Sequence, residues 1–81
     1  MAKLKILSGS DLVKVFAELG FSIVSQKGSQ IKLQRTQENH GKQTLTIPLH
    51  EELDKGTLKA IYRQSLRYIP EDILKPHFYT S

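Results

Sequence analysis

A helical period of hydrophobic residues opens the chain. Leucine, valine and phenylalanine recur three to four residues apart over residues 10–19, which places them on one face of a helix. Ser8 stands before this stretch with Asp11 three residues further on, so their side chains can cap the free N–H groups of the first turn. Gly20 supplies a helix stop. We therefore expect one amphipathic helix over residues 10–19.

Beyond this helix the hydrophobic period changes to two, which is typical of strands with one apolar face. The expected strands lie at residues 21–24, 30–35 and 44–47. Polar turns are expected between them, at residues 27–28 and 37–43. In the second strand Ile31 and Leu33 fall on the apolar face, and Gln30 falls on the polar face. Pro48 ends the third strand, because proline cannot donate to a ladder.

Two further helices are predicted in the last third of the chain. The first begins at Asp54 or Lys55 and runs to about Tyr68. Its apolar stripe consists of Leu58, Ile61, Tyr62, Ser65, Leu66 and Ile69. A short third helix begins at Pro70, since proline suits a first turn, and Pro76 is expected to end it. The tail beyond is expected either to pack locally or to fray.

The order of elements is helix, three strands, helix, with a short extra helix. A three-stranded antiparallel sheet with one apolar face needs cover, which helices on that face can supply. We predict an α+β fold, α-β-β-β-α, that resembles the double-stranded-RNA-binding fold and leaves the other sheet face polar. No repeat or linker divides the sequence, so residues 1–81 are expected to form one domain with its core at about 8–74.

The amino-acid composition excludes some kinds of functional site. The 81 residues include no cysteine, which excludes thiolate metal sites, disulfides and cysteine nucleophiles. The net charge of +4 favours a polyanion or an acidic partner, although a solvated basic surface explains it equally well. No apolar run approaches the roughly 18 residues of a membrane span. We therefore expect a soluble, cytoplasmic protein without membrane contact.

Four short blocks occur in the same order as in one protein family. They are Ser8–Val13 with Leu19-Gly20-Phe21, Gln26–Ser29, Ile47–His50, and Lys55–Ile61 with Arg63-Gln64. Each block alone is a weak pattern, but the four in register are specific. Together they resemble the HicA (YcfA-type) family of bacterial toxins. The fold ascribed to that family agrees with the order of elements derived above from periodicity.

The resemblance implies a toxin of a toxin–antitoxin pair. HicA toxins cleave messenger RNA without a metal or other cofactor, and a HicB-like antitoxin covers their active site. The family pattern places its catalytic histidine directly after Gly-Ser, where this chain has Gln30. An imidazole titrates near neutrality and can move protons during RNA cleavage, whereas a glutamine amide cannot. The resemblance therefore implies an endoribonuclease that is impaired in this copy.

Three explanations of Gln30 remain open. The substitution was engineered, or a natural lineage retired the activity, or a different histidine acts. We favour the first two. His50 falls where the family pattern also has histidine, and a structural role there is favoured over catalysis, so it is only a possible secondary site residue. His40, in a polar loop, and His77, in the tail, are expected to be solvent-exposed bystanders without metal-ligand spacing.

Basic and polar residues supply candidate RNA contacts. Those near Gln30 are Lys27, Ser29 and Lys32, and those on the second helix are Lys55, Lys59 and Arg63. Lys55 stands near the helix start, where free N–H groups favour phosphate. The alternative is a solvated helix face balanced by neighbouring acids. Two rival functions also stay open: a non-catalytic RNA-binding module of this fold, and a protein that binds only the antitoxin.

Overall fold

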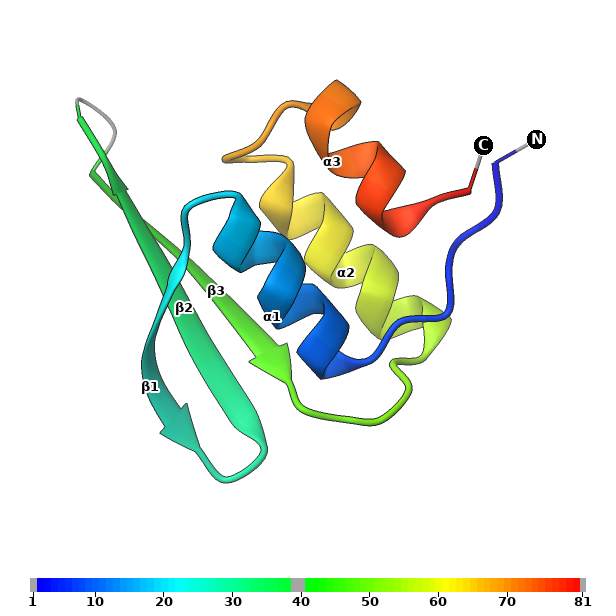
Figure 1. Ribbon diagram of the computed structural model, residues 1–81, viewed down its shortest axis with the longest axis horizontal. Coiled ribbons are helices and arrows are strands. Elements are labelled where there is room, and N and C mark those ends of the chain that lie inside the picture. Colours follow the sequence, from blue (N-terminus) through cyan, green and yellow to red (C-terminus); the bar gives the residue numbers. More distant parts are fainter. Residues whose placement is uncertain (1, 39–40, 81) are drawn as a thin grey trace.

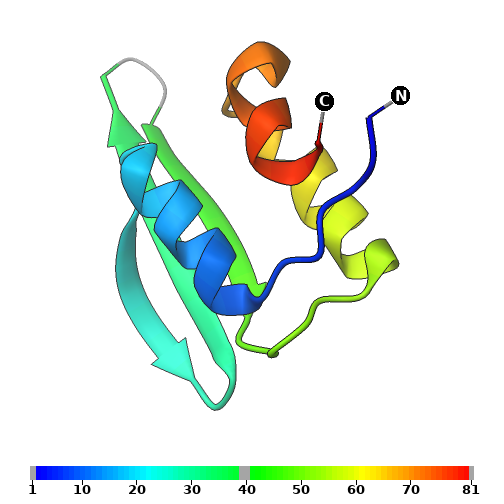
Figure 2. The same cartoon turned by 45° about the vertical axis from the view of Figure 1, so that its right-hand side comes forward.

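The computed structural model describes residues 2–38 and 41–80. In this part of the chain the elements are α1 (Gly9–Glu18), β1 (Ser22–Lys27), β2 (Gln30–Gln37), β3 (Gly41–Pro48), α2 (Lys55–Ser65) and α3 (Glu71–Phe78). The strands form one antiparallel sheet in the order β1-β2-β3. Figures 1 and 2 show the helices gathered on one side of the sheet. The predicted α-β-β-β-α fold is confirmed.

The alternation along β2 separates the two faces of the sheet. Ile31 and Leu33 are buried, while Gln30 and Lys32 are exposed. The helices contribute the rest of the core, mainly Leu12 and Phe16 of α1, Leu58 and Ile61 of α2, and Leu74 and Phe78 of α3. We call the uncovered side, which carries Gln30 and Lys32, the open face. It is the polar face that the period of two predicts.

The hairpin between β2 and β3 is longer than the sequence suggested. The ladder continues as far as the pair Gln37–Gly41, so most of the stretch predicted as a turn is strand. Gln43 in that stretch is buried because its side-chain oxygen accepts a hydrogen bond from the Arg35 guanidinium at 2.8 Å. A polar residue with a buried partner disguises a strand in the hydropathy pattern.

The ends of the last two helices also differ from expectation. α2 ends at Ser65, and residues 66–69 form a turn in which the Ser65 carbonyl accepts hydrogen bonds from the N–H groups of Tyr68 and Ile69. Ile69 is nevertheless buried, so the apolar period ran on past the helix. α3 continues through Pro76, because the fully buried Phe78 packs edge-on against Tyr62, with ring centroids 5.2 Å apart.

The two ends of the described chain lie side by side (Figure 1). Leu4 forms a β-bridge with Tyr79, and the Lys5 N–H donates to the Phe78 carbonyl at 2.8 Å. The Thr80 N–H donates to the Lys3 carbonyl at 2.8 Å. Of the two alternatives for the tail, local packing therefore holds as far as Thr80.

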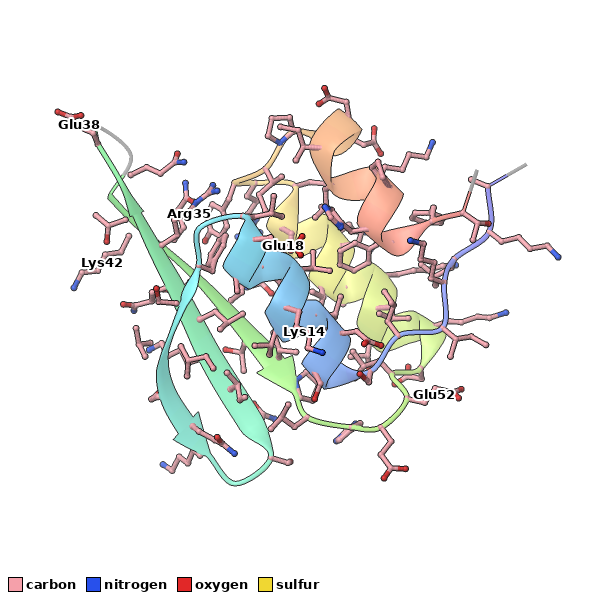
Figure 3. The ribbon with its side chains drawn as sticks, in the orientation of Figure 1. Lys14, Glu18, Arg35, Glu38, Lys42 and Glu52 are labelled. Atoms are coloured by element: carbon pink, nitrogen blue, oxygen red, sulfur yellow. The ribbon has the colours of Figure 1, made fainter. Side chains whose placement is uncertain are left out.

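Arg35 ties the sheet to the helical layer. It follows Ile31 and Leu33 on the inner face of β2, and its guanidinium donates to the backbone carbonyls of Leu19 at 2.8 Å and Tyr68 at 2.9 Å. The same group lies 4.9 Å from the ring centroid of Phe21. Burial lowers the pKa of Arg35, but a guanidinium stays charged under all ordinary conditions. Figure 3 shows this side chain beside the end of α1.

Candidate active site

Gln30 lies at the centre of one end of the sheet. It is the first residue of β2, and the ladder pairs it with Lys27 of β1 on one side and with Pro48 of β3 on the other. Directly paired residues of an antiparallel sheet point to the same face. The Gln30 side chain is exposed, opposite to the buried Ile31. The structure therefore gives position 30 an open, solvent-facing location flanked by both neighbouring strands.

Two lysines share this location. Lys27 is the direct partner of Gln30, and Lys32 stands two residues along the same strand, which returns it to the same face. Both are exposed. Ser29 occupies the turn between them, beside Gly28, whose φ of 60° is the left-handed conformation that glycine adopts without strain. The structure thus brings together the four residues predicted around position 30.

We call the segment Pro48–His50, at this end of the sheet, the rim of the open face. Its backbone is held from two sides. The Leu49 N–H donates to the Ser29 carbonyl at 2.6 Å, which extends the β2–β3 ladder beyond Pro48. The Gly9 N–H donates to the His50 carbonyl at 2.9 Å, so the start of α1 is fastened to the same segment. A Cβ at position 9 would overlap the Pro48 carbonyl, and only glycine permits this approach.

Capping keeps α1 in this place. The Ser8 hydroxyl accepts from the Asp11 N–H at 3.0 Å, and the Asp11 carboxylate accepts from the Ser8 N–H at 2.9 Å. The hydrogen bond from the Ser8 N–H to the carboxylate, and after it the Ser8 hydroxyl beside that carboxylate, lower the pKa of Asp11. The capping box predicted from the sequence is confirmed.

The basic residues of α2 belong to a different surface. Lys55, Lys59 and Arg63 are exposed on a helix that lies on the other side of the sheet from the open face (Figure 2). Arg63 and Arg67, with Ala60 and Gln64, line a shallow hollow of about 450 Å³. The structure does not bring these residues to Gln30. They remain candidates for RNA contact at a second site.

The start of α2 is occupied by its own cap. The Asp54 carboxylate accepts from the Thr57 hydroxyl at 2.6 Å and from the Thr57 N–H at 3.0 Å, and these bonds lower the pKa of Asp54. Because the Asp54 carboxylate already accepts from an N–H group of the first turn, it competes with any phosphate for that group. The sequence argument for Lys55 relied on free N–H groups, so this part of it is weakened.

The histidines that the structure describes do not lie together. His50 is exposed on the segment after β3, whereas His77 lies half-buried in α3, since that helix continues past Pro76. The expectation of an exposed His77 in the tail was wrong. His40 lies outside the described residues. Among residues 2–38 and 41–80, no three acidic or histidine side chains gather in a way that could hold a metal ion.

Two residues of the open face escaped the sequence reasoning. Ser25 of β1 and Thr46 of β3 each pair with Lys32 of β2 and are exposed beside it. The signal that could have found them is the register: once Gln30 is opposite Pro48, antiparallel pairing fixes every other partner. The open face near position 30 thus carries an amide, two ammonium groups and several hydroxyls, and the exposed imidazole of His50 lies on the segment that follows β3.

The fold and the site place this chain among small α+β domains with a polar, basic sheet face. Such a face can attract a polyanion such as a nucleic acid. The family model described as the HicA toxin of bacterial toxin–antitoxin systems matches residues 9–65, from the start of α1 to the end of α2. Because the match covers well over half of the chain, the protein belongs to the HicA toxin family. Comparisons with curated proteins and with solved structures each give no match.

The family defines the biological setting in general terms. A toxin of a toxin–antitoxin system has an antitoxin partner, and the family's general substrate is RNA. In the part of the chain that the structure describes, no helix is long and apolar enough to cross a membrane.

Proposed function

We propose that this toxin is an endoribonuclease scaffold for messenger RNA, with its site at position 30, and that Gln30 impairs it. The observation that carries the proposal is the placement of Gln30 on the open face between Lys27 and Pro48. A histidine at this position would meet solvent and an RNA strand rather than the core. The ammonium groups of Lys27 and Lys32 would neutralise the phosphate that reacts.

The chemistry requires no metal. In the active form, His at position 30 takes the proton of a ribose 2′-hydroxyl, whose oxygen attacks the adjacent phosphorus. The bond to the 5′-oxygen breaks, the leaving 5′-oxygen takes up a proton from water, and a 2′,3′-cyclic phosphate remains; the imidazolium returns its proton to the hydroxide so formed. General acid–base catalysis contributes roughly 10²–10⁴ in rate. The Gln30 amide can hydrogen-bond a phosphate oxygen but cannot carry the proton, so the present chain loses a factor of this order.

The proposal extends to the two partners, RNA and an antitoxin. Lys27, Ser29 and Lys32 hold the RNA backbone near the reacting bond, and Lys55, Lys59 and Arg63 supply a second basic surface on α2. A HicB-like antitoxin that covers the open face would block the site. The toxin would then act in the cytoplasm, where messenger RNA is exposed once the antitoxin is lost.

Expression in bacteria tests the proposal. We expect cells that produce the Gln30→His chain to stop growing and to lose full-length messenger RNA, while cells that produce the present chain grow almost normally. Co-expression of a HicB-like antitoxin should restore growth. Continued growth and intact messenger RNA with Gln30→His would refute the nuclease proposal. Bound RNA without cleavage would then favour the RNA-binding alternative, and antitoxin binding alone would favour the other.

A further inference from the structure

The segment after β3 carries an imidazole, that of His50, to which the proposed function gives no role. Near position 30 the exposed side chains are an amide, several hydroxyls and two ammonium groups, none of which is a base near neutrality. His50, two residues beyond the ladder partner of Gln30, has an imidazole, which can accept a proton. We propose that His50 serves as the general base in a slow RNA cleavage that the present chain retains. This inference rests on the proposed function.

The register brings His50 close to Gln30. Gln30 pairs with Pro48, the last residue of β3. The Leu49 N–H donates to the Ser29 carbonyl, so the chain just beyond β3 stays beside the turn that precedes Gln30. His50 follows directly on this anchored segment, two residues beyond the partner of Gln30, and is exposed.

The imidazole is free to react while its backbone is fixed. Within the described residues, the side chain of His50 makes no hydrogen bond, and it is exposed. Its own carbonyl accepts from the Gly9 N–H, and the preceding N–H donates to Ser29. An exposed imidazole without a protein partner, carried on an anchored segment, is accessible to a ligand.

The step balances without a co-reactant other than water. The His50 ring nitrogen takes the proton of the 2′-hydroxyl as the 2′-oxygen bonds to phosphorus. The bond between phosphorus and the 5′-oxygen breaks, and the leaving oxygen takes a proton from water. The imidazolium then returns its proton to the hydroxide so formed. Lys27 and Lys32 offset the charge on the phosphate, and Gln30 donates a hydrogen bond to a phosphate oxygen.

Single-turnover cleavage of a labelled RNA tests this role. We expect His50→Gln in the present chain to lower the rate at least about tenfold, a conservative share of the usual contribution of a general base. His77→Gln removes an imidazole from α3 in the helical layer and should leave the rate within about twofold. Free imidazole in the buffer should raise the cleavage rate of His50→Ala but should not raise that of the present chain.

The Gln30→His chain separates failure of this inference from failure of the proposed function. If Gln30→His cleaves while the present chain and its His50→Gln variant have the same rate, measurable or not, His50 is not the base and the nuclease scaffold stands. If imidazole fails to rescue His50→Ala, the base role is likewise overturned. If Gln30→His does not cleave, both proposals fall together. A loss confined to His50→Gln, with rescue of His50→Ala, establishes the role.

Discussion

At the scale of single residues, Arg35 contributes more to the stability of the fold than its place in a polar strand suggests. Its guanidinium bonds three acceptors from three parts of the chain: Gln43, Leu19 and Tyr68. Replacement by methionine keeps the apolar stem but leaves those acceptors without a donor. We expect Arg35→Met to lower the free energy of unfolding by about 2–3 kcal/mol, measured by urea denaturation. Arg67→Met, at an exposed arginine, should change it by less than about 0.5 kcal/mol.

Equal stability of the two arginine variants would contradict this role of Arg35. Its hydrogen bonds would then be no better than those that water makes with the same groups.

Gly9 is the residue where α1 touches the rim of the site. An alanine Cβ there would overlap the Pro48 carbonyl and lie 2.8 Å from the Leu49 Cα, and both are backbone atoms that cannot rotate away. We expect Gly9→Ala to destabilise the fold by about 1–3 kcal/mol in thermal or urea unfolding. Ser10→Ala, at the next and exposed position, should have little effect. A neutral Gly9→Ala would show that the rim can move aside.

At the scale of elements, the helix starts make stability depend on acid. Hydrogen bonds hold the pKa values of Asp11 and Asp54 below their ordinary range. A carboxylate with a lowered folded-state pKa adds stability above its unfolded pKa, near 4, and loses it as the pH falls through the lower folded value. We therefore expect the free energy of unfolding to decrease steadily as the pH is lowered from about 5 to 2.

Asp54→Asn isolates one of these caps. Asparagine can still accept from the Thr57 N–H but does not titrate, so the variant should show a flatter pH dependence in urea melts at successive pH values. Glu52→Gln removes a neighbouring carboxylate that points to solvent (Figure 3) and should leave the slope unchanged. An unchanged slope in Asp54→Asn would mean that its carboxylate interacts equally in the folded and unfolded chains.

Element by element, prediction succeeded where local chemistry decides the structure. The α1 cap and the two faces of β2 follow from neighbours within a few residues. It failed where distant contacts decide: Gln43 is buried because of Arg35, and α3 passes Pro76 because Phe78 reaches the core. For the site, alternation predicted the cluster around Gln30. The pairing of Gln30 with Pro48, which brings the segment of His50 near the site, depends on strand register, and hydropathy alone does not fix that register.

At the scale of the whole molecule, the fold separates two basic surfaces, one on the open face and one on α2. If RNA lies on the open face, loss of Lys27 and Lys32 removes phosphate contacts. We expect the Lys27→Ala/Lys32→Ala chain to bind a short single-stranded RNA more weakly, with its salt slope reduced by about one per lysine. Fluorescence anisotropy at several salt concentrations measures both quantities.

Lys3→Ala/Lys14→Ala is the matched control, because it removes the same net charge from the terminus and from α1. It should leave the salt slope nearly unchanged. Equal reductions in both double variants would mean that RNA senses only the total charge of the molecule, and the open face would lose its special role.

The ratio of the RNA cleavage rate of Gln30→His to that of the present chain tests most directly whether the reaction is centred on position 30. Gln34→His serves as the control, because it places an imidazole on the same strand and face, four residues from position 30. We expect Gln30→His to cleave roughly 10²–10⁴ times faster than the present chain, and Gln34→His to stay near the unmodified rate. A ratio close to one, or equal activation by histidine at both positions, would contradict a reaction centred on position 30.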